Sequence, residues 1–570
     1  MKHLKSLLAA TLAAAAAMLA GCTPGPQPPV TPDPPETGCA HTFMAMSHSA
    51  GSCTEDDVTV FRCTRCGEET ETVRRASGHS FTDWTLAMPT ADPAADHESR
   101  TCTVCGAVET RALTERGGGD ETVLASLAKM PAGGGSYYDD TDASADRLRA
   151  LISLYNARRG TLTPAEVAML EEDFRAARAN LSYITSDIPL VFITTAKTPG
   201  TEYREAELVF VDTDGTVVWS EETGEIRTHG NSTSWSKKKS YNVKLSQKAN
   251  LFDVETARKW VLIGNQYDVT RIRNAVAYSL ADRLGLPYTP SYTYVDAYVN
   301  GEYWGEYMLV EKIDASETSV DINPDAGDFL FEVENWRPKE GVTFITTKKL
   351  NLRVGLNAPE VPTDDQLTAI TATLNAFDKA LSAGVWADVA ALCDVDSFVN
   401  YYLFHEFVKD LDVSISSTRF FCKGGIMYAG PAWDFDLSMG NAHPDDRPAY
   451  FTGDKDGVTG IWAGQQNKWF RAFVKYDEFM ALVKARYAEV APLIRSVYDE
   501  NAEGGALIDI LADAYRPSFE RTSKIAGCKF YRYSALEREP EKNYDGNLEY
   551  LRKWLRLRDE WLRGTWGIGG

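Results

Sequence analysis

Positive charge is scarce in this sequence relative to negative charge. The 570 residues include 59 Lys and Arg against 81 Asp and Glu, which gives a formal net charge of −22. A surface that binds nucleic acid generally needs excess positive charge, so this balance argues against that class of function. A phosphate-binding site would have to be a local basic patch within an acidic protein.

Long apolar runs are also lacking after residue 22, so the sequence predicts no membrane span beyond that point. Residues 1–22 predict a signal segment, with a positively charged start and a short apolar run. The run ends in Leu19-Ala-Gly-Cys22, which resembles a lipobox. An ordinary secretory signal with an incidental Cys22 is the alternative. We expect an extracytoplasmic protein, anchored to the bacterial cell envelope only by a lipid on Cys22.

Composition divides the rest of the chain. Residues 23–38 are a Pro-rich linker, and residues 39–112 are rich in Cys and His. Residues 142–183 have helical periodicity that restarts after Gly160, which predicts a helical hairpin. Residues 187–566 form the main domain. Hydrophobic residues make up 44% of the sequence, enough for a sizeable core.

The segment 39–112 contains a duplicated unit. Each copy has a His-x-Phe triplet followed by Cys-x-x-Cys-Gly, which indicates one repeated structural element. The residues that could bind a metal ion are His41, Cys63 and Cys66 in the first copy and His79, Cys102 and Cys105 in the second. A recurring His beside a Cys pair predicts one Zn²⁺ site in each repeat. Disulfides, with Cys39 and Cys53 taking part, are the alternative in a secreted protein.

The main domain changes character along its length. Strand patterns dominate up to about residue 311, with Asp214-Gly215 and Asn300-Gly301 as hairpin turns. One helix is predicted among them, over 268–284 and capped by Asp268. From about residue 365 the pattern is helical, interrupted by a strand pair at 418–432. The sequence therefore predicts an α+β fold, with a sheet-rich lobe followed by a helix-rich lobe.

A small polar loop with Gly230 at its centre lies within residues 227–245, and four lysines lie in or just after it. Backbone N–H groups and lysines suit a triphosphate, which needs many donors and compact positive charge. The loop is neither a Walker loop nor a GxGxxG motif. A polar hairpin with solvated lysines is the alternative.

Five ordered blocks of the main domain resemble the CotH (spore coat protein H) kinase-like family. They are the loop just described, Trp260-Val-Leu-Ile-Gly-Asn-Gln-Tyr-Asp268 with Arg273-Asn274, Tyr298-Val-Asn-Gly-Glu-Tyr-Trp-Gly-Glu-Tyr307 with Glu311, Glu406 with Asp412, and Gly430-Pro-Ala-Trp-Asp-Phe-Asp436 with Gly440-Asn441. The resemblance implies a two-lobed protein-kinase-like fold.

The resemblance also implies site residues. Asp434 would hold Mg²⁺ or Mn²⁺, with Asp436 helping, because such ions prefer carboxylate oxygens. Asp412 would be the catalytic Asp that orients or deprotonates the acceptor hydroxyl. For Asp434 the alternative is a structural cap, and for Asp412 a solvated turn that also contains Asp410.

ATP would be bound mainly by the sheet-rich lobe. Lys244 is the first choice for the phosphates and Lys238 the second, with Asn231 in the loop between the strands. Glu311 would lie where a nucleotide base could dock. Arg273 would pair either with a phosphate or with a carboxylate.

Two functions follow from these residues. The first is a secreted atypical protein kinase that transfers the γ-phosphate of ATP to Ser or Thr of surface or secreted proteins. The second is a catalytically silent surface module used for binding or adhesion. Retention of Asp412, Asp434 and the loop lysines favours the kinase.

Overall fold

The computed structural model describes most of the chain. The described residues are 41–76, 78–82, 84–87, 97–112, 121–128, 143–183, 186–230, 236–335, 341–445, 447–451, 453–502, 504–525 and 537–569. The predicted signal segment with Cys22, the linker 23–38 and Asn231 lie outside them. Within the described residues, no helix is both long enough and apolar enough to cross a membrane.

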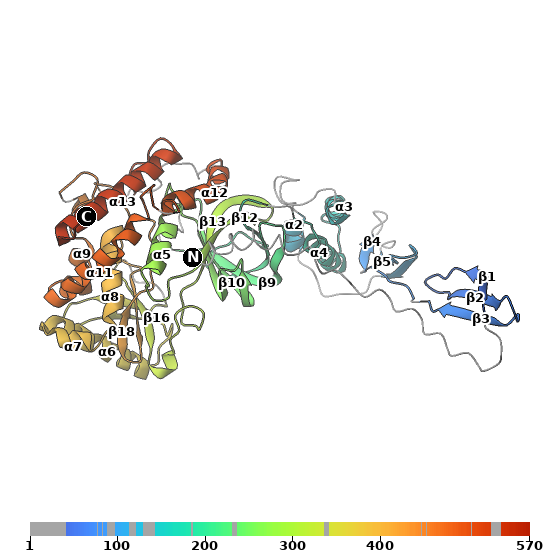
Figure 1. Ribbon diagram of the computed structural model, residues 1–570, viewed down its shortest axis with the longest axis horizontal. Helices are drawn as coiled ribbons and strands as arrows, with labels where there is room; N and C mark the ends of the chain where they lie inside the picture. Colours follow the sequence, from blue (N-terminus) through green and yellow to red (C-terminus); the bar gives the residue numbers. More distant parts are fainter. Residues whose placement is uncertain are drawn as a thin grey trace. The chain divides into compact units, whose positions relative to one another are not determined.

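The chain divides into two compact units, each described by itself below. One contains Met1–Trp84 and Ser99–Arg111, and the other contains Thr85–Glu98 and Ala112–Gly570 (Figure 1).

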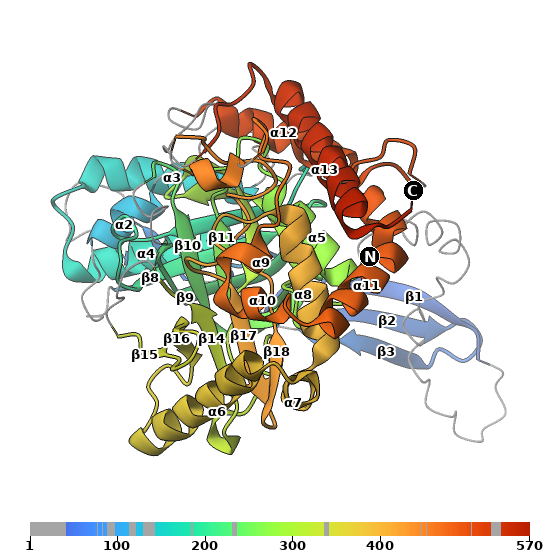
Figure 2. The same cartoon turned by 90° about the vertical axis from the view of Figure 1, so that its left-hand side faces the viewer.

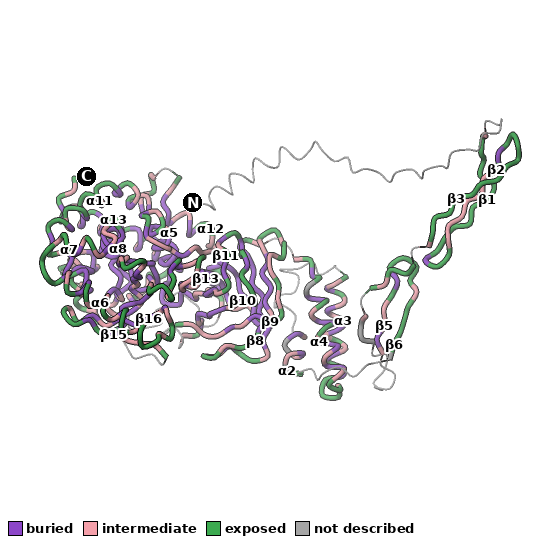
Figure 3. The backbone as a smooth tube through the Cα atoms, turned by 90° about the horizontal axis from the view of Figure 1, so that it is seen from below, coloured by how far each residue is buried: buried purple, intermediate pink, exposed green. Residues whose placement is uncertain are grey.

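The duplicated repeats form small three-stranded sheets, and the strands of the first sheet are antiparallel. The first has the order β1 (Phe43–Ser49), β2 (Asp57–Cys63), β3 (Glu69–Arg74). The second has the order β4 (Thr85–Ala87), β5 (His97–Thr101), β6 (Val108–Ala112). Every residue of β1 and β3 is exposed, as the tube in Figure 3 shows. Such thin sheets bury too little apolar surface to be stable by packing alone, so they need cross-links or metal ions.

Among the described residues, three helices precede the main domain: α2 (Glu121–Leu127), α3 (Ala143–Arg158) and α4 (Pro164–Ala179). The last two occupy the range predicted for the helical hairpin. Thr163 caps α4 in a capping box with Glu166, whose carboxylate also pairs with the buried Arg158 at 2.9 Å. The reciprocal cap explains why the helix restarts at the Thr-Pro step after Gly160.

A closed barrel forms the first part of the main domain. Its strand order is β10-β11-β13-β12-β7-β8-β9, and all neighbours are antiparallel except β12 and β7. The strands are β7 (Leu190–Thr194), β8 (Arg204–Val211), β9 (Val217–His229), β10 (Ser240–Leu251), β11 (Glu255–Ile263), β12 (Tyr292–Val299) and β13 (Glu302–Glu311). Alternate side chains, including Ile226, Val243, Trp260 and Leu309, fill the interior.

Helix α5 (Arg273–Arg283) connects β11 to β12 and begins later than predicted. Its N-cap is Ile272, which makes no side-chain cap. Asp268 is outside the helix, but its carboxylate accepts a hydrogen bond from the Arg273 backbone N–H at 2.8 Å. The predicted capping residue therefore satisfies the helix N-terminus from a preceding turn, which sequence periodicity alone does not reveal.

The second part of the main domain combines a five-stranded sheet with helices (Figure 2). The sheet has the order β15 (Phe344–Thr346), β16 (Arg353–Ala358), β14 (Phe329–Val333), β17 (Arg419–Lys423), β18 (Ile426–Ala429). The helices are α6 (Asp364–Ala383), α7 (Trp386–Ala390), α8 (Val395–Val408), α9 (Ala463–Gln466), α10 (Lys468–Phe473), α11 (Asp477–Arg495), α12 (Leu507–Ser523) and α13 (Tyr544–Trp566). The predicted α+β class is confirmed.

Helix α12 attaches the barrel to the helix-rich part. Asp296 of β12 is fully buried and accepts hydrogen bonds from the hydroxyl of Ser518 and from the Arg521 guanidinium on α12. Thr522 accepts a hydrogen bond from the Glu306 backbone N–H at 2.7 Å. These buried polar contacts fix the barrel against a helix that lies more than 200 residues later in the chain.

Candidate functional site

Four aspartates that follow two different elements form a carboxylate cluster: Asp410, Asp412, Asp434 and Asp436. The first pair comes directly after α8, which ends because Lys409 adopts a left-handed conformation with φ 48°. Asp410 is buried, and its carboxylate accepts a hydrogen bond from the Asp412 backbone N–H at 3.0 Å.

The lysine that ends α8 is held inside the protein. The Lys409 ammonium donates to the backbone carbonyls of Tyr450, Gly457 and Thr459 at 2.6–2.7 Å. The indole N–H of Trp462 donates to the carbonyl of Asp410 at 2.6 Å. The turn with Asp410 and Asp412 is therefore fixed by buried contacts and is not the solvated turn considered as the alternative.

The second pair follows β18. Asp434 has φ 70°, in the left-handed region that Asp and Asn tolerate better than most residues. Its carboxylate accepts a hydrogen bond from the Ser417 hydroxyl at 3.1 Å. The next backbone N–H, of Phe435, donates to the Asn274 side chain at 2.7 Å, and Asn274 donates in turn to Asn265 at 3.0 Å. The block at 260–274 therefore holds the block at 430–436 in place.

Electrostatic repulsion is strong within the carboxylate cluster. Burial raises the pKa of Asp410 and Asp436 well above the ordinary range, and the neighbouring aspartates raise both further. Burial, followed by Asp434 and Glu334, raises the pKa of Asp412 to about 7, although Arg447 opposes the shift. Like charges brought together out of water disfavour ionisation. A bound divalent cation would remove that penalty, so the donor set fits Mg²⁺ or Mn²⁺.

The cluster is not a closed metal cage. In the part of the chain that the structure describes, the only groups of three or more Cys, His, Asp or Glu ligand atoms within 4.8 Å of one another belong to the Cys/His repeats. The aspartates therefore leave coordination positions for other oxygens. Mg²⁺ usually uses one or two carboxylates together with water and phosphate oxygens, which matches this arrangement.

Four basic residues share the outer face of the barrel, and we call them the basic row: Arg227, Lys244, Lys259 and Lys312. Strand register places Lys244 opposite Lys259, while Asn242 of the same β10 face lies opposite Arg227. Lys312 directly follows β13, and its backbone N–H extends the ladder by donating to the carbonyl of Lys259 at 3.0 Å. Burial, followed by Lys259, lowers the pKa of Lys312.

Two members of the basic row already have carboxylate partners and two do not. Lys244 pairs with Glu225, and Lys259 pairs with Asp314 at 3.0 Å. Among the described residues, neither Arg227 nor Lys312 forms an ion pair. The Arg227 Nε atom is buried and has no hydrogen-bond partner among the described residues. Positive charge without a partner at this surface fits an anionic ligand.

His229 links the barrel face to the carboxylate cluster. Its ring lies 6.2 Å from that of Trp433, the residue before Asp434, and the Arg419 guanidinium lies 5.0 Å from the same indole. Burial, followed by the cations Lys312 and Arg419, lowers the pKa of His229 to about 4. Two further buried donors without a partner among the described residues are Nε and Nη1 of Arg419. Donors from both parts of the domain therefore gather beside Asp434.

Two predicted phosphate ligands are used for internal structure instead. The Lys238 ammonium is 1% exposed, donates to the Gly264 carbonyl at 2.8 Å and pairs with Glu306. Arg273 is buried, pairs with Asp268 and donates to the Ser438 carbonyl at 3.1 Å. Of the two partners considered for Arg273, the structure places a carboxylate beside it.

Glu311 lies on the other face of the sheet from the basic row. It is opposite Trp260 in the ladder, and Trp260 points into the barrel. Burial, followed by Glu255, raises the pKa of Glu311 to about 8. Its Oε1 atom has no hydrogen-bond partner in the described part of the chain.

Glu406, another residue of the resemblance, forms part of the framework. Both carboxylate oxygens accept backbone hydrogen bonds, from Trp462 and Gly464 at 2.8 Å each. The fully buried Arg558 of α13 pairs with the same carboxylate at 3.1 Å. Glu406 therefore joins three segments behind the aspartate turn and is not open to a ligand.

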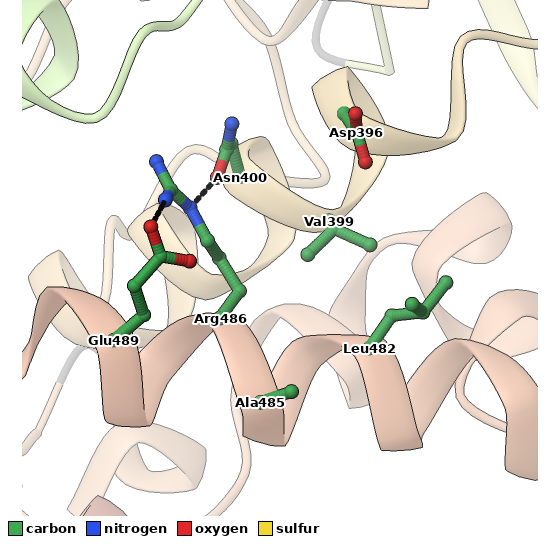
Figure 4. Close-up of a pocket in the computed structure, with 7 residues that line it drawn as sticks. All are labelled: Asp396, Val399, Asn400, Leu482, Ala485, Arg486 and Glu489. Atoms are coloured by element: carbon green, nitrogen blue, oxygen red, sulfur yellow. Dashed lines mark hydrogen bonds and ion pairs between the residues drawn. The ribbon is translucent and has the colours of Figure 1, made fainter.

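A surface hollow between α8 and α11 is distant from the carboxylate cluster. It is lined by Asp396, Val399, Asn400, Leu482, Ala485, Arg486 and Glu489 (Figure 4). Arg486 bridges Asn400 at 2.9 Å and Glu489 at 2.7 Å. Most of the length of α8 separates Asn400 from Asp410, and the cation in the hollow is already paired. We therefore assign no phosphate site to it.

The six predicted zinc ligands fall into two groups, as the repeats suggested. His41, Cys63 and Cys66 come together in one group, and His79, Cys102 and Cys105 in the other. The second group also includes Cys53, which sequence reasoning had considered only as a disulfide partner. In the main domain, Cys393 and Cys422 are buried thiols, and Cys528 lies outside the described residues.

The protein family described as CotH kinase protein matches residues 226–562, more than half of the chain. The match begins within β9, so β7 and β8 complete the barrel from outside it. No curated protein matches the chain.

Proposed function

Because this chain belongs to the CotH kinase protein family, we propose that it is a phosphotransferase that moves the γ-phosphate of ATP to Ser or Thr hydroxyls of proteins. The observation that carries the proposal is the arrangement of charge. A basic barrel face with partnerless donors lies next to four aspartates, of which Asp410 and Asp436 are buried and Asp412 and Asp434 are partly exposed. Phosphoryl transfer requires this combination of cations for the phosphates and carboxylates for a metal ion.

The proposed architecture is that of a two-lobed kinase. The barrel would be the nucleotide-binding lobe, and the sheet with its helices would be the catalytic lobe. Contacts of the Trp433 indole with His229 of the barrel and with Arg419 of the second sheet support this assignment.

We assign the phosphates of ATP to Arg227, Lys312 and Lys244. Arg227 and Lys312 have no ion pair among the described residues, and Lys244 would exchange Glu225 for a phosphate. Arg419 would add donors from the second sheet. Lys238 and Arg273 would act indirectly, by keeping the β10–β11 end of the barrel and the start of α5 in position.

We assign Asp434 and Asp436 to a divalent metal ion, which would neutralise phosphate charge when bound. Asp412 would accept a hydrogen bond from the acceptor hydroxyl and take its proton as the oxygen attacks. A general base works best when its pKa is near the working pH, and the pKa of Asp412 is about 7. Asp410 holds the Asp412 backbone and so positions it.

The remaining proposals concern place and partners. A lipid on Cys22 would anchor the chain to the cell envelope, and the acceptors would be surface or secreted proteins.

The test is phosphate transfer from labelled ATP with Mn²⁺ or Mg²⁺, measured as autophosphorylation and as transfer to a generic Ser/Thr substrate. Asp434→Asn is preferable to Asp434→Ala, because Asn tolerates the left-handed backbone and removes only the charge. Asp445→Asn, an exposed aspartate with 94% of its side chain accessible, is the matched control.

We expect label in the wild type and in Asp445→Asn, and none above background in Asp434→Asn or Asp412→Asn. Wild-type protein that binds neither ATP nor the metal, and transfers no label, would refute the kinase proposal and favour the silent binding module.

A further inference from the structure

The second Cys/His group contains a ligand from the first repeat. Cys53, His79, Cys102 and Cys105 each offer one ligand atom, and these atoms all lie within 4.8 Å of one another. Cys53 belongs to the loop between β1 and β2, and its side chain is buried with 5% exposure. The Cys53 and Cys102 sulfurs lie 3.8 Å apart although 49 residues separate them in sequence.

These separations match the edges of a metal-centred tetrahedron. With Zn–S bonds of about 2.3 Å, two sulfurs of a tetrahedral site lie roughly 3.8 Å apart, whereas a disulfide bond is about 2.05 Å long. The Cys105 sulfur lies 3.3 Å from Nδ1 of His79, close to the shorter sulfur–nitrogen edge expected with a Zn–N bond of about 2.0 Å. Three thiolates and one imidazole are a common zinc ligand set.

Both repeats build the same turn around their Cys-x-x-Cys pair. The backbone N–H of Gly67 donates to the Cys63 carbonyl at 2.9 Å, and that of Gly106 donates to the Cys102 carbonyl at 2.9 Å. Both glycines have left-handed backbones, with φ 79° and 72°. The Gly that follows each pair in the sequence therefore closes a turn that aims two sulfurs in one direction.

The histidines are also oriented alike. The His41 ring stacks on Phe43 with centroids 5.4 Å apart, and the His79 ring lies 5.1 Å from Phe81. Nδ1 of His41 lies 3.3 Å from the Cys66 sulfur, while its Nε2 faces Glu68 at 3.4 Å. A carboxylate behind a histidine is the usual outer partner of a metal-binding imidazole. The conserved His-x-Phe spacing of the two copies therefore has a structural reason.

We propose that Cys53, His79, Cys102 and Cys105 bind one zinc ion, which fastens the β1–β2 loop of the first repeat to the Cys-x-x-Cys turn of the second. The first group, with His41, Cys63 and Cys66, binds a second ion within its own repeat. Because β1 and β3 are fully exposed, the ions replace the hydrophobic core that these sheets lack. The inter-repeat ion also closes a long loop, which disfavours the unfolded chain.

The test is zinc content of the purified full chain, measured by inductively coupled plasma mass spectrometry. Cys53→Ser should bind one zinc ion fewer per chain than the wild type, while Cys422→Ser, a buried thiol of the main domain, should bind as many as the wild type. With Co²⁺ in place of zinc, Cys53→Ser should lose part of the thiolate-to-metal absorption.

A second variant separates ligand loss from misfolding. Cys53→His offers another zinc ligand at the same place, so it should retain the full zinc content. Equal zinc in wild type and Cys53→Ser would overturn the proposal, as would loss of zinc from both Cys53 variants. Peptide mapping that finds Cys53 in a disulfide with Cys102 or Cys105 in the purified protein would also overturn it.

Discussion

Replacing Asp412 with Asn should stabilise the metal-free protein at alkaline pH and have little effect at acid pH. Burial and the charges of Asp434 and Glu334 raise the pKa of Asp412 from 3.8 to about 7. Between pH 3.8 and about pH 7, Asp412 keeps its proton in the folded protein but releases it in the unfolded chain. Rising pH therefore favours the unfolded state, and the loss of stability is complete once the pH exceeds the folded-state pKa.

The size of the effect follows from the shift. Integrating between pH 5 and pH 8 gives a loss of at most about 2.5 kcal/mol in the free energy of unfolding. We expect roughly half of that, because Asp412 is partly exposed and shares its charge with three neighbouring aspartates. Asp412→Asn lacks the titrating group, so its advantage over the wild type should grow by about 1 kcal/mol across this pH range.

The assay is urea unfolding followed by tryptophan fluorescence at pH 5 and pH 8, without nucleotide or divalent metal. All tryptophans except Trp84 lie beyond the repeats, so the signal reports on the main domain. A chelator should not be used, because it would also remove the zinc ions that we propose for the repeats. The exposed Asp445→Asn is the control. An Asp412→Asn variant whose difference from wild type is the same at both pH values would refute the repulsion argument.

Three further predictions follow from the structure, and a fourth follows from the sequence. In thermal-shift titrations, Mg²⁺ with ATP should raise the melting temperature of the wild type but not of Asp434→Asn, because binding only the folded state stabilises it by mass action. Lys312→Ala should raise the KM for ATP about tenfold or more, whereas the exposed Lys248→Ala should leave it unchanged. If the two variants have the same KM for ATP, Lys312 does not bind the nucleotide. Glu406→Ala should lower the urea-unfolding free energy by about 3–5 kcal/mol, since its buried arginine partner is left unpaired. Cys22→Ala should appear in the medium or remain unprocessed in cell fractionation, and retention on the membrane like the wild type would contradict lipid anchoring.

The sequence predicted strands well where neighbouring strands are joined by a short turn. The hairpin turn predicted at Asn300-Gly301 joins β12 to β13, which are antiparallel. The sequence did not show that seven strands close into a barrel, because closure depends on the parallel pairing of β12 with β7, more than 90 residues earlier. Pairing between distant segments leaves no periodic signal.

The same distinction applies to the candidate site: its local motifs could be predicted from the sequence, but contacts between distant segments could not. Asp410, Asp412, Asp434 and Asp436 were visible as motifs, and the structure brings them together. Lys312 was missed because only the strand register shows that it shares a face with Lys244 and Lys259.

Lys238 is the opposite case, a residue that was predicted as a phosphate ligand but whose side chain is buried inside the protein. A lysine in a polar loop has the composition of a phosphate ligand, yet its ammonium turns inward to Glu306 and the Gly264 carbonyl. Which side of the chain faces the interior depends on segments far along the sequence. Cys53 was likewise invisible as a zinc ligand, because it does not belong to the repeated motif.

Helix α13 supplies part of the support for the aspartate turn. Its Arg558 donates to the carbonyls of Glu406, Val458 and Gly460, which lie on both sides of that turn. Helix α13 begins more than 130 residues after the aspartate turn in the sequence, so the turn cannot acquire these contacts before α13 has folded against α8. We therefore expect the geometry of the aspartates to be set late in folding, when α13 packs into place.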